Sequence, residues 1–299
     1  MSCGYWILNN IGSIFIPIFI FFLGYIVKVF NAKKLKQTDL KRHRTMLQTW
    51  YNGIKPAFKD QQDSIEALSL RVSKNDDLNS VPYQKVIIPY KCLDSLSLVK
   101  LYDIFIYNST IPQAEQEIAA QHIFNIVSTI EFLEQNQILF EKQYLYYSDN
   151  LRDLMKDWNE NMNQIHDLVN SHKAGTNPTP IETQFAAEVF DAFKETEKAN
   201  IENGNIPSIS IYEDHFILPI LTKFTNDQHK YATSSFIAKV ISANKNLLQL
   251  VLQFKTYKKT YPIVFQQIKD ENQKAIDKMD AAFKYFASKP IPNVWNIKP

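Results

Sequence analysis

Hydrophobic and polar positions along this chain fall into long runs with helical spacing. Apolar residues between 36 and 74 recur three, four or seven positions apart, at Leu40, Leu47, Trp50, Ile54, Phe58, Ile65, Leu68 and Val72. Such spacing places them on one face of an α-helix. The pattern stops at residues 75–90, where two prolines and several polar turn residues predict a loop. A short helix is expected next, at about 93–107.

The clearest heptad pattern starts near Gln113 and continues to His172. Its main line is Ile126, Leu133, Phe140, Tyr147 and Leu154, flanked by Ile123, Ile130, Tyr144, Leu151 and Trp158. A sustained heptad predicts one long helix that packs along its length against other helices. We therefore predict that the main line forms a continuous buried stripe. A bend at 148–150 is the alternative to an unbroken helix.

Turn and capping signals divide the rest of the chain. The stretch 172–180 is the best internal boundary, and capping boxes are predicted at Thr110–Gln113, Thr179–Glu182 and Ser210–Glu213. Two helical segments, at about 229–260 and 262–287, finish the pattern. Pro262 is expected to end or kink the first of them, because proline lacks the amide hydrogen that an inner helical turn needs.

These elements predict an all-α fold, in which a single N-terminal transmembrane helix precedes an elongated bundle of long antiparallel helices with coiled-coil-like packing. The expected divisions are a short extracytoplasmic N-terminus (1–10), the transmembrane anchor (11–30), a basic juxtamembrane segment and helix (31–76), and two bundle parts (77–172 and 180–290). One ungapped shift aligns the main heptad line with Val240, Leu247, Phe254, Tyr261 and Ile268. Two pseudo-repeats would explain this match, but so would two unrelated heptad runs.

The anchor prediction depends on charge. No charged side chain occurs between Ser2 and Val27, and the apolar run matches the ~20 residues that a bilayer-spanning helix needs. A buried core helix is an alternative, although core helices are seldom free of charge for so long. A cleaved signal peptide is disfavoured, because nothing basic precedes the run and no Ala-x-Ala site follows it.

A basic flank follows the apolar run. It contains Lys28, Lys33, Lys34, Lys36, Lys41, Arg42 and Arg44 against the single acid Asp39. Basic residues beside a span stay on the cytoplasmic side, so we expect a single-pass protein of the cell (inner or plasma) membrane, with its N-terminus outside and its C-terminal domain in the cytoplasm. The flank would also contact anionic lipid headgroups.

Overall charge and composition narrow the function further. The chain has 33 basic and 31 acidic residues, so acids prevail once the flank is removed, and no nucleic-acid partner is expected. Only six glycines occur, and no glycine-rich phosphate-binding loop is present. The two cysteines, Cys3 and Cys92, would lie on opposite sides of the membrane, so they cannot pair within one chain, and no CxxC motif for zinc or redox chemistry occurs. Because neither a phosphate-binding loop nor such a motif is present, we expect no cofactor. We assume a bacterial host, because Asn, Lys, Ile, Tyr and Phe are abundant, as in AT-rich genomes.

The strongest candidate for chemistry is the doublet His166-Asp167. With His122 upstream and Asp214 or Asp227 downstream, it resembles the ligands of some all-helical phosphohydrolases, in which a divalent metal activates water. However, Ile165 and Val169 occupy the core positions of this segment, which predicts that His166 faces solvent.

Two functions follow from the sequence. The first is a membrane-anchored cytoplasmic scaffold, adaptor or signalling partner without enzymatic activity. Its partners would be the lipid bilayer, through residues 11–30, and other proteins or a second copy, through its helices. The alternative is a membrane-anchored, metal-dependent phosphohydrolase that uses the His-Asp doublet.

Overall fold

The computed structural model describes the backbone of residues 3–88, 90, 98–107, 111–174, 178–204, 207–290 and 293. Within these ranges it describes side chains from Phe19 onward, Ala174 excepted.

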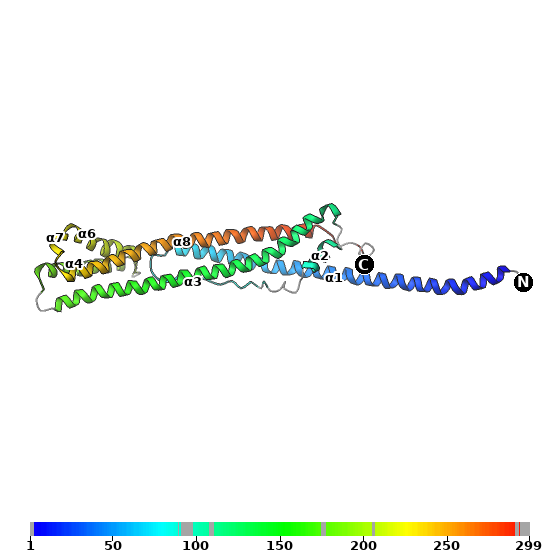
Figure 1. Cartoon of the computed structure of the whole chain (residues 1–299), viewed down its shortest axis with the longest axis horizontal. Coiled ribbons are helices and arrows are strands. Elements are labelled where there is room, and N and C mark those ends of the chain that lie inside the picture. Colours follow the sequence, from blue (N-terminus) through cyan, green and yellow to red (C-terminus); the bar gives the residue numbers. More distant parts are fainter. Residues whose placement is uncertain are drawn as a thin grey trace. The chain divides into compact units, whose positions relative to one another are not determined.

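Three long helices, α1 (Cys3–Lys74), α3 (Gln116–Ala174) and α8 (Ser235–Ala287), dominate this part of the chain (Figure 1). The shorter elements are α2 (Leu98–Tyr102), the π-helical turn η2 (Asp103–Tyr107), the 3₁₀ turn η3 (Gln113–Glu115), α4 (Pro180–Glu202), α5 (Ile209–Tyr212), the π-helical turn η4 (Glu213–Ile217), α6 (Leu218–Asn226) and α7 (Gln228–Tyr231). The described residues contain no strand, which confirms the all-α class.

The chain forms two compact units that each combine distant segments. Unit 1 contains Met1–Gln61, Val86–Asn136 and Glu271–Pro299, and unit 2 contains Gln62–Lys85 and Gln137–Asp270. The helices α1, α3 and α8 each contribute to both units. The boundary expected at 172–180 therefore lies inside unit 2.

In unit 1, α8 runs antiparallel to both α1 and α3. Arg44 of α1 contacts Lys289 after the end of α8, whereas Lys55, three turns later in α1, forms an ion pair with Asp280 at 2.7 Å. On α3, the Thr129 hydroxyl donates to the Ala275 carbonyl at 3.4 Å, and seven residues later the Asn136 side chain donates to that of Asn272 at 2.9 Å. These contacts confirm the predicted antiparallel packing of long helices.

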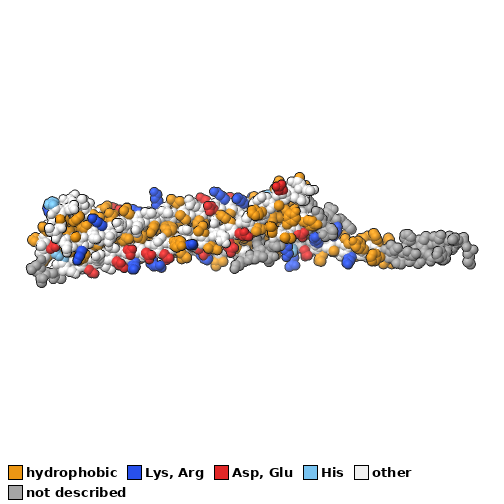
Figure 2. Space-filling view, in the orientation of Figure 1, with side chains coloured by type: hydrophobic (Ala, Val, Ile, Leu, Met, Phe, Trp, Pro, Cys, Tyr) orange, Lys and Arg blue, Asp and Glu red, His pale blue; other side chains and the backbone are white. Residues whose placement is uncertain are grey.

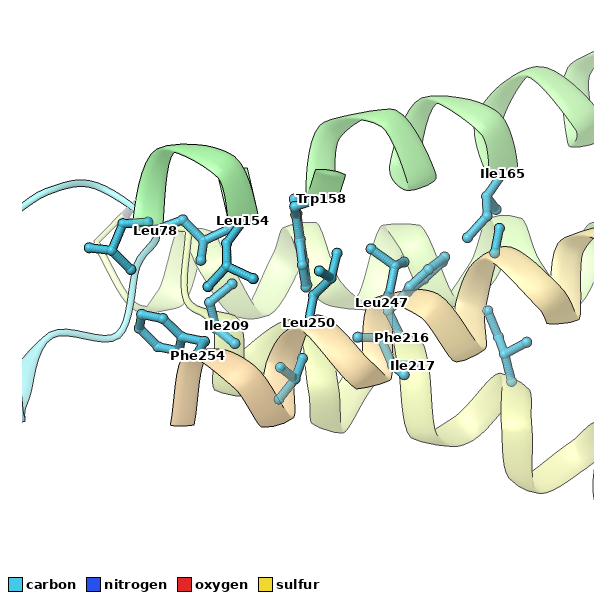
Figure 3. Packing of buried hydrophobic residues seen from close by; sticks show 14 of the residues in the cluster. Leu78, Leu154, Trp158, Ile165, Ile209, Phe216, Ile217, Leu247, Leu250 and Phe254 are labelled. Atoms are coloured by element: carbon cyan, nitrogen blue, oxygen red, sulfur yellow. The ribbon is translucent and has the colours of Figure 1, made fainter. Parts of the chain in front are cut away.

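In unit 2, the core combines α3, α8 and the segment α5–η4 with the end of α1 and with α4. Figure 3 shows Trp158 and Ile165 of α3 directed toward α8, whose Leu247 and Leu250 share the cluster with Phe216 and Ile217 of η4. The Trp158 ring also meets the Tyr212 ring edge-on, at 5.5 Å between centroids. Apolar side chains from distant stretches of the sequence thus share one core.

The predicted buried stripe on α3 is confirmed. Its five members, Ile126, Leu133, Phe140, Tyr147 and Leu154, are at most 4% exposed. The helix continues without a break through 148–150, so the alternative of a bend is wrong. On α8, the counterparts Val240, Leu247, Phe254 and Ile268 are also buried, whereas Tyr261 is half-buried. The internal duplication stays a prediction.

The division of the last helical region at Pro262 is wrong. Pro262 lies inside the single helix α8, which continues to Ala287. Its neighbours explain why the helix persists, because Tyr261 and Phe265 pack against the Tyr147 ring, and the Ser69 hydroxyl donates to the Pro262 carbonyl at 3.0 Å. Tertiary contacts therefore offset the missing hydrogen bond of proline.

The start of α8 also differs from the expected residue 229. Residues 228–231 form the separate helix α7, and α8 begins after Ser234. The Ser234 hydroxyl oxygen accepts a hydrogen bond from the Ile237 amide at 3.2 Å and donates to Glu182 at 2.6 Å. Ser234 therefore provides the side-chain cap that begins a helix.

The three predicted capping boxes have different outcomes. The box at Thr179 and Glu182 is confirmed, with both reciprocal hydrogen bonds and Pro180 at the first helical turn. The box at Ser210 is wrong, because Ser208 caps α5 by accepting from the Ile211 amide at 3.3 Å. Thr110 lies outside the described residues, as do residues 93–97 of the expected short helix.

Candidate functional site

An exposed apolar run near the start of α1 is the most unusual surface of unit 1. Each of the residues Phe19, Ile20, Phe21, Phe22, Leu23, Tyr25, Ile26 and Val27 is between 45% and 76% exposed. Successive residues of a helix point about 100° apart, so these side chains cover its whole circumference. Soluble proteins rarely expose a continuous apolar surface of this kind unless it binds something. Figure 2 shows hydrophobic side chains on this part of α1, next to the grey atoms.

The run is only part of the predicted anchor. Residues 1–18, which include the expected extracytoplasmic segment and the first part of the span 11–30, lie outside the described side chains. Across the residues that the structure does describe, no helix has an apolar stretch long enough to span a bilayer.

The basic flank follows the run on the same helix. Lys28, Lys34, Lys41 and Arg42 are exposed, whereas Lys33 and Lys36 are half-buried. The Lys36 ammonium lies 5.8 Å from the centre of the Tyr107 ring. Cationic groups thus follow the apolar run over about four helical turns.

Arg44 differs from the rest of the predicted headgroup-contacting set. Its Nε and Nη2 donate to the Ile104 carbonyl, both at 3.2 Å, and its Nη1 donates to the Lys289 carbonyl at 2.7 Å. The guanidinium also lies over the Phe105 ring, 5.3 Å from its centre. Burial lowers the pKa of Arg44 below its ordinary value. Arg44 therefore ties α1 to η2 and to the end of α8.

The sequence contained a signal for this internal role. Arg44 lies four residues after Leu40 and three before Leu47, and both leucines are at most 3% exposed. Residues at this spacing share one helix face, so Arg44 belongs to the core-facing row of α1. In the sequence, Arg44 is also the last member of the basic flank, so its place in the core-facing row was missed.

The two π-helical turns have similar supports, each within its own unit. In unit 1, Arg44 donates to the carbonyl of Ile104 in η2. In unit 2, the fully buried Asn244 of α8 donates to the carbonyl of Ile217 in η4 at 2.9 Å. A π-turn departs from the regular helical hydrogen-bond pattern, and in both cases a side chain from a long helix contacts one of its carbonyls. Sequence periodicity did not reveal either turn.

Asp76 organises the junction between the end of α1 and the start of α5 in unit 2. Its carboxylate accepts hydrogen bonds from the hydroxyls of Ser208 and Ser210, the latter at 3.0 Å, and lies 3.5 Å from the Lys258 ammonium. Burial alone would raise the pKa of Asp76, but these donors and the lysine charge outweigh it and lower the pKa. The carboxylate thus stabilises the junction in its ionised form.

The candidate metal ligands do not form a cluster. His166 and Asp167 are exposed on α3, and the nearest hydrogen-bonding partner of His166 is Asn170, one turn away on the same helix. Asp214 is exposed on η4, whereas His122 belongs to unit 1, where its ring stacks on Tyr285 at 4.4 Å. Among the residues that the structure describes, no three His, Cys, Asp or Glu side chains are grouped so that they could hold a metal ion.

The fold and these surfaces define an all-helical protein with long antiparallel helices and an exposed apolar run near its N-terminus. No protein-family model matches the chain, and neither a curated protein nor a solved structure matches it. The function is therefore inferred from the molecule itself.

Proposed function

We propose that this chain is a membrane-anchored, cytoplasmic helical scaffold or adaptor without enzymatic activity. The observation that carries the proposal is the apolar run of α1, which is free of charge and exposed around the whole helix. Such a surface is stable in a bilayer, where apolar side chains meet lipid and the helix satisfies its own backbone hydrogen bonds. The long helices would supply the surfaces that bind partner proteins.

The basic flank supports an orientation. Its cationic residues follow the apolar run, and none precedes it in the sequence. Retention of basic residues in the cytoplasm would leave the N-terminus outside and the residues after the span in the cytoplasm. The exposed members of the flank would then lie at the anionic lipid surface, each contributing about 1 kcal/mol close to the headgroups.

A matched pair of substitutions in α1 tests the anchor. Phe21 is 76% exposed and Leu35 is 66% exposed, so neither Phe21→Arg nor Leu35→Arg removes a core contact. Phe21 lies near the middle of the proposed span, where an arginine costs roughly 2.5–3.5 kcal/mol of insertion free energy. Phe21→Arg should therefore shift the protein from the membrane to the soluble fraction, whereas Leu35→Arg should stay in the membrane.

Deletion of residues 1–30 removes the whole proposed anchor and should release the chain completely from the membrane. If the deleted chain still resisted extraction with carbonate, the anchor would be refuted. Orientation is tested separately with reporter enzymes fused after Pro299. A reporter active only in the cytoplasm should work, and activity of a reporter that functions only outside would refute the orientation.

A further inference from the structure

A groove in unit 1 runs between the first half of α3 and the last part of α8. Its volume is about 610 Å³, and its lining includes Phe124, Ser128 and Phe132 from α3 and Ala275 from α8. Phe124 is 59% exposed and Phe132 is 40% exposed. Exposed aromatic side chains beside a hollow are typical of a surface that receives another helix.

The two helices that border the groove carry charges, next to the lining on α3 and within it on α8, that can complement each other. On α3, Glu131 follows Phe124 by seven residues, so both side chains share one side of this helix. On α8, Lys274 and Lys278 line the groove, with the acid Glu271 one turn before Lys274. These four charged side chains are exposed, and none of them forms an ion pair with another described residue.

Contacts across the groove place Glu131 and Lys274 at the same height. The Thr129 hydroxyl donates to the Ala275 carbonyl at 3.4 Å, and Asn136 donates to Asn272 at 2.9 Å. Glu131 and Lys274 both lie between these two contacts. They therefore face outward at one level, on opposite sides of the groove.

We propose that this face binds the same face of a second copy of the chain, through a two-fold axis parallel to the helices. That axis places each α3 opposite the partner's α8, at an unchanged height along the helices. Glu131 of each copy then meets Lys274 of the partner subunit, so two ion pairs flank the phenylalanines at the centre. A two-fold axis across the helices would instead set like charges against each other.

The proposed anchor favours the same axis, and this step depends on the proposed function. Two copies inserted in one membrane with the same orientation must be related by an axis normal to that membrane. In unit 1, α8 runs antiparallel to both α1 and α3, and the proposed anchor is the first part of α1. An axis parallel to these helices is therefore available to anchored copies. Confinement to one membrane also raises the effective concentration of copies, which compensates for a face with few apolar side chains.

A charge-reversal cycle on the full-length chain tests the pairing. Donor and acceptor fluorophores are fused after Pro299 of separate copies, and energy transfer is measured in membranes at a fixed surface density. Glu131→Lys and Lys274→Glu should each weaken association about tenfold, because each replaces two attractive contacts by two repulsive ones. The double variant E131K/K274E should restore association to within about twofold, because both pairs re-form with reversed signs.

A control with the same charge changes uses residues off the face. Lys59 and Asp60 are exposed on α1, which contributes no residue to the groove, and K59E/D60K should leave energy transfer unchanged. Failure of both single variants to weaken association would overturn the pairing. Loss in the single variants without rescue in the double variant would overturn it too, because that result indicates a different partner.

Membrane fractionation of the same cells separates this proposal from the proposed function. If the wild-type chain is absent from the membrane, the anchor has failed. If it is present in the membrane but gives no energy transfer above that of unpaired fluorophores, the pairing alone has failed.

Discussion

Truncation of Leu133 to alanine is the most direct test of the packing of unit 1. The side chain is fully buried, in a cluster that draws on α1, α3 and α8. Deleting a buried leucine side chain costs about 2–5 kcal/mol, and the cost grows with the cavity that remains. The backbone at this position has little freedom to collapse, because α3 is continuous on both sides and the Tyr90 hydroxyl approaches the Leu133 carbonyl at 3.4 Å. We therefore expect Leu133→Ala to lower the free energy of unfolding by about 3–5 kcal/mol, in the upper part of that range.

The measurement is urea unfolding of the purified protein, followed by the helical circular dichroism signal. With a denaturant dependence of about 2–3 kcal/mol per molar urea, the expected loss lowers the midpoint by roughly 1–2.5 M. Ile118→Ala is the matched control on the same helix, because Ile118 is 53% exposed. Its cost should be within about 0.5 kcal/mol. Equal midpoints for the wild type and Leu133→Ala would refute the heptad assignment and the bundle built on it.

Three further predictions concern polar side chains. Arg44→Met keeps the length of the side chain but leaves the Ile104 and Lys289 carbonyls without their donor, so it should lower the free energy of unfolding by about 1.5–3 kcal/mol. An unchanged urea midpoint would refute the structural role of Arg44. Asp76 has a lowered pKa in the folded protein, so its contribution to stability is present above the unfolded value of about 3.9 and is lost as the pH falls through the folded pKa. Asp76→Asn should therefore reduce stability at pH 7 and flatten its decline below pH 4, and an unchanged acid limb of the stability profile would contradict this reasoning. His166→Ala should change stability by about 0.5 kcal/mol or less, because the side chain is exposed, and the loss of a cellular activity without a change in the melting temperature would favour the metal-dependent hydrolase instead.

Periodicity predicted the all-α class and the core of α3 correctly, because a heptad needs only local geometry. Residues seven positions apart fall on one helix face in any long helix, so Ile126 and Leu133 could be placed in the core without knowledge of their neighbours. The Thr179 cap was equally local, because its donor and acceptor lie three residues apart. The apolar run of α1 could be found in the same way, because the absence of charged residues is a property of consecutive positions in the sequence.

Only the tertiary structure decided the features that depend on distant partners. Pro262 would end an isolated helix, but rings and a hydroxyl from α3 and α1 hold α8 together there. Arg44 belonged to a basic cluster in the sequence, but carbonyls of Ile104 and Lys289, far away in the chain, make it an internal tie. The division into two units has the same cause. Antiparallel packing joins the first half of α3 to the end of α8, so the compact units follow contacts between helices and not the turns that separate those helices in the sequence.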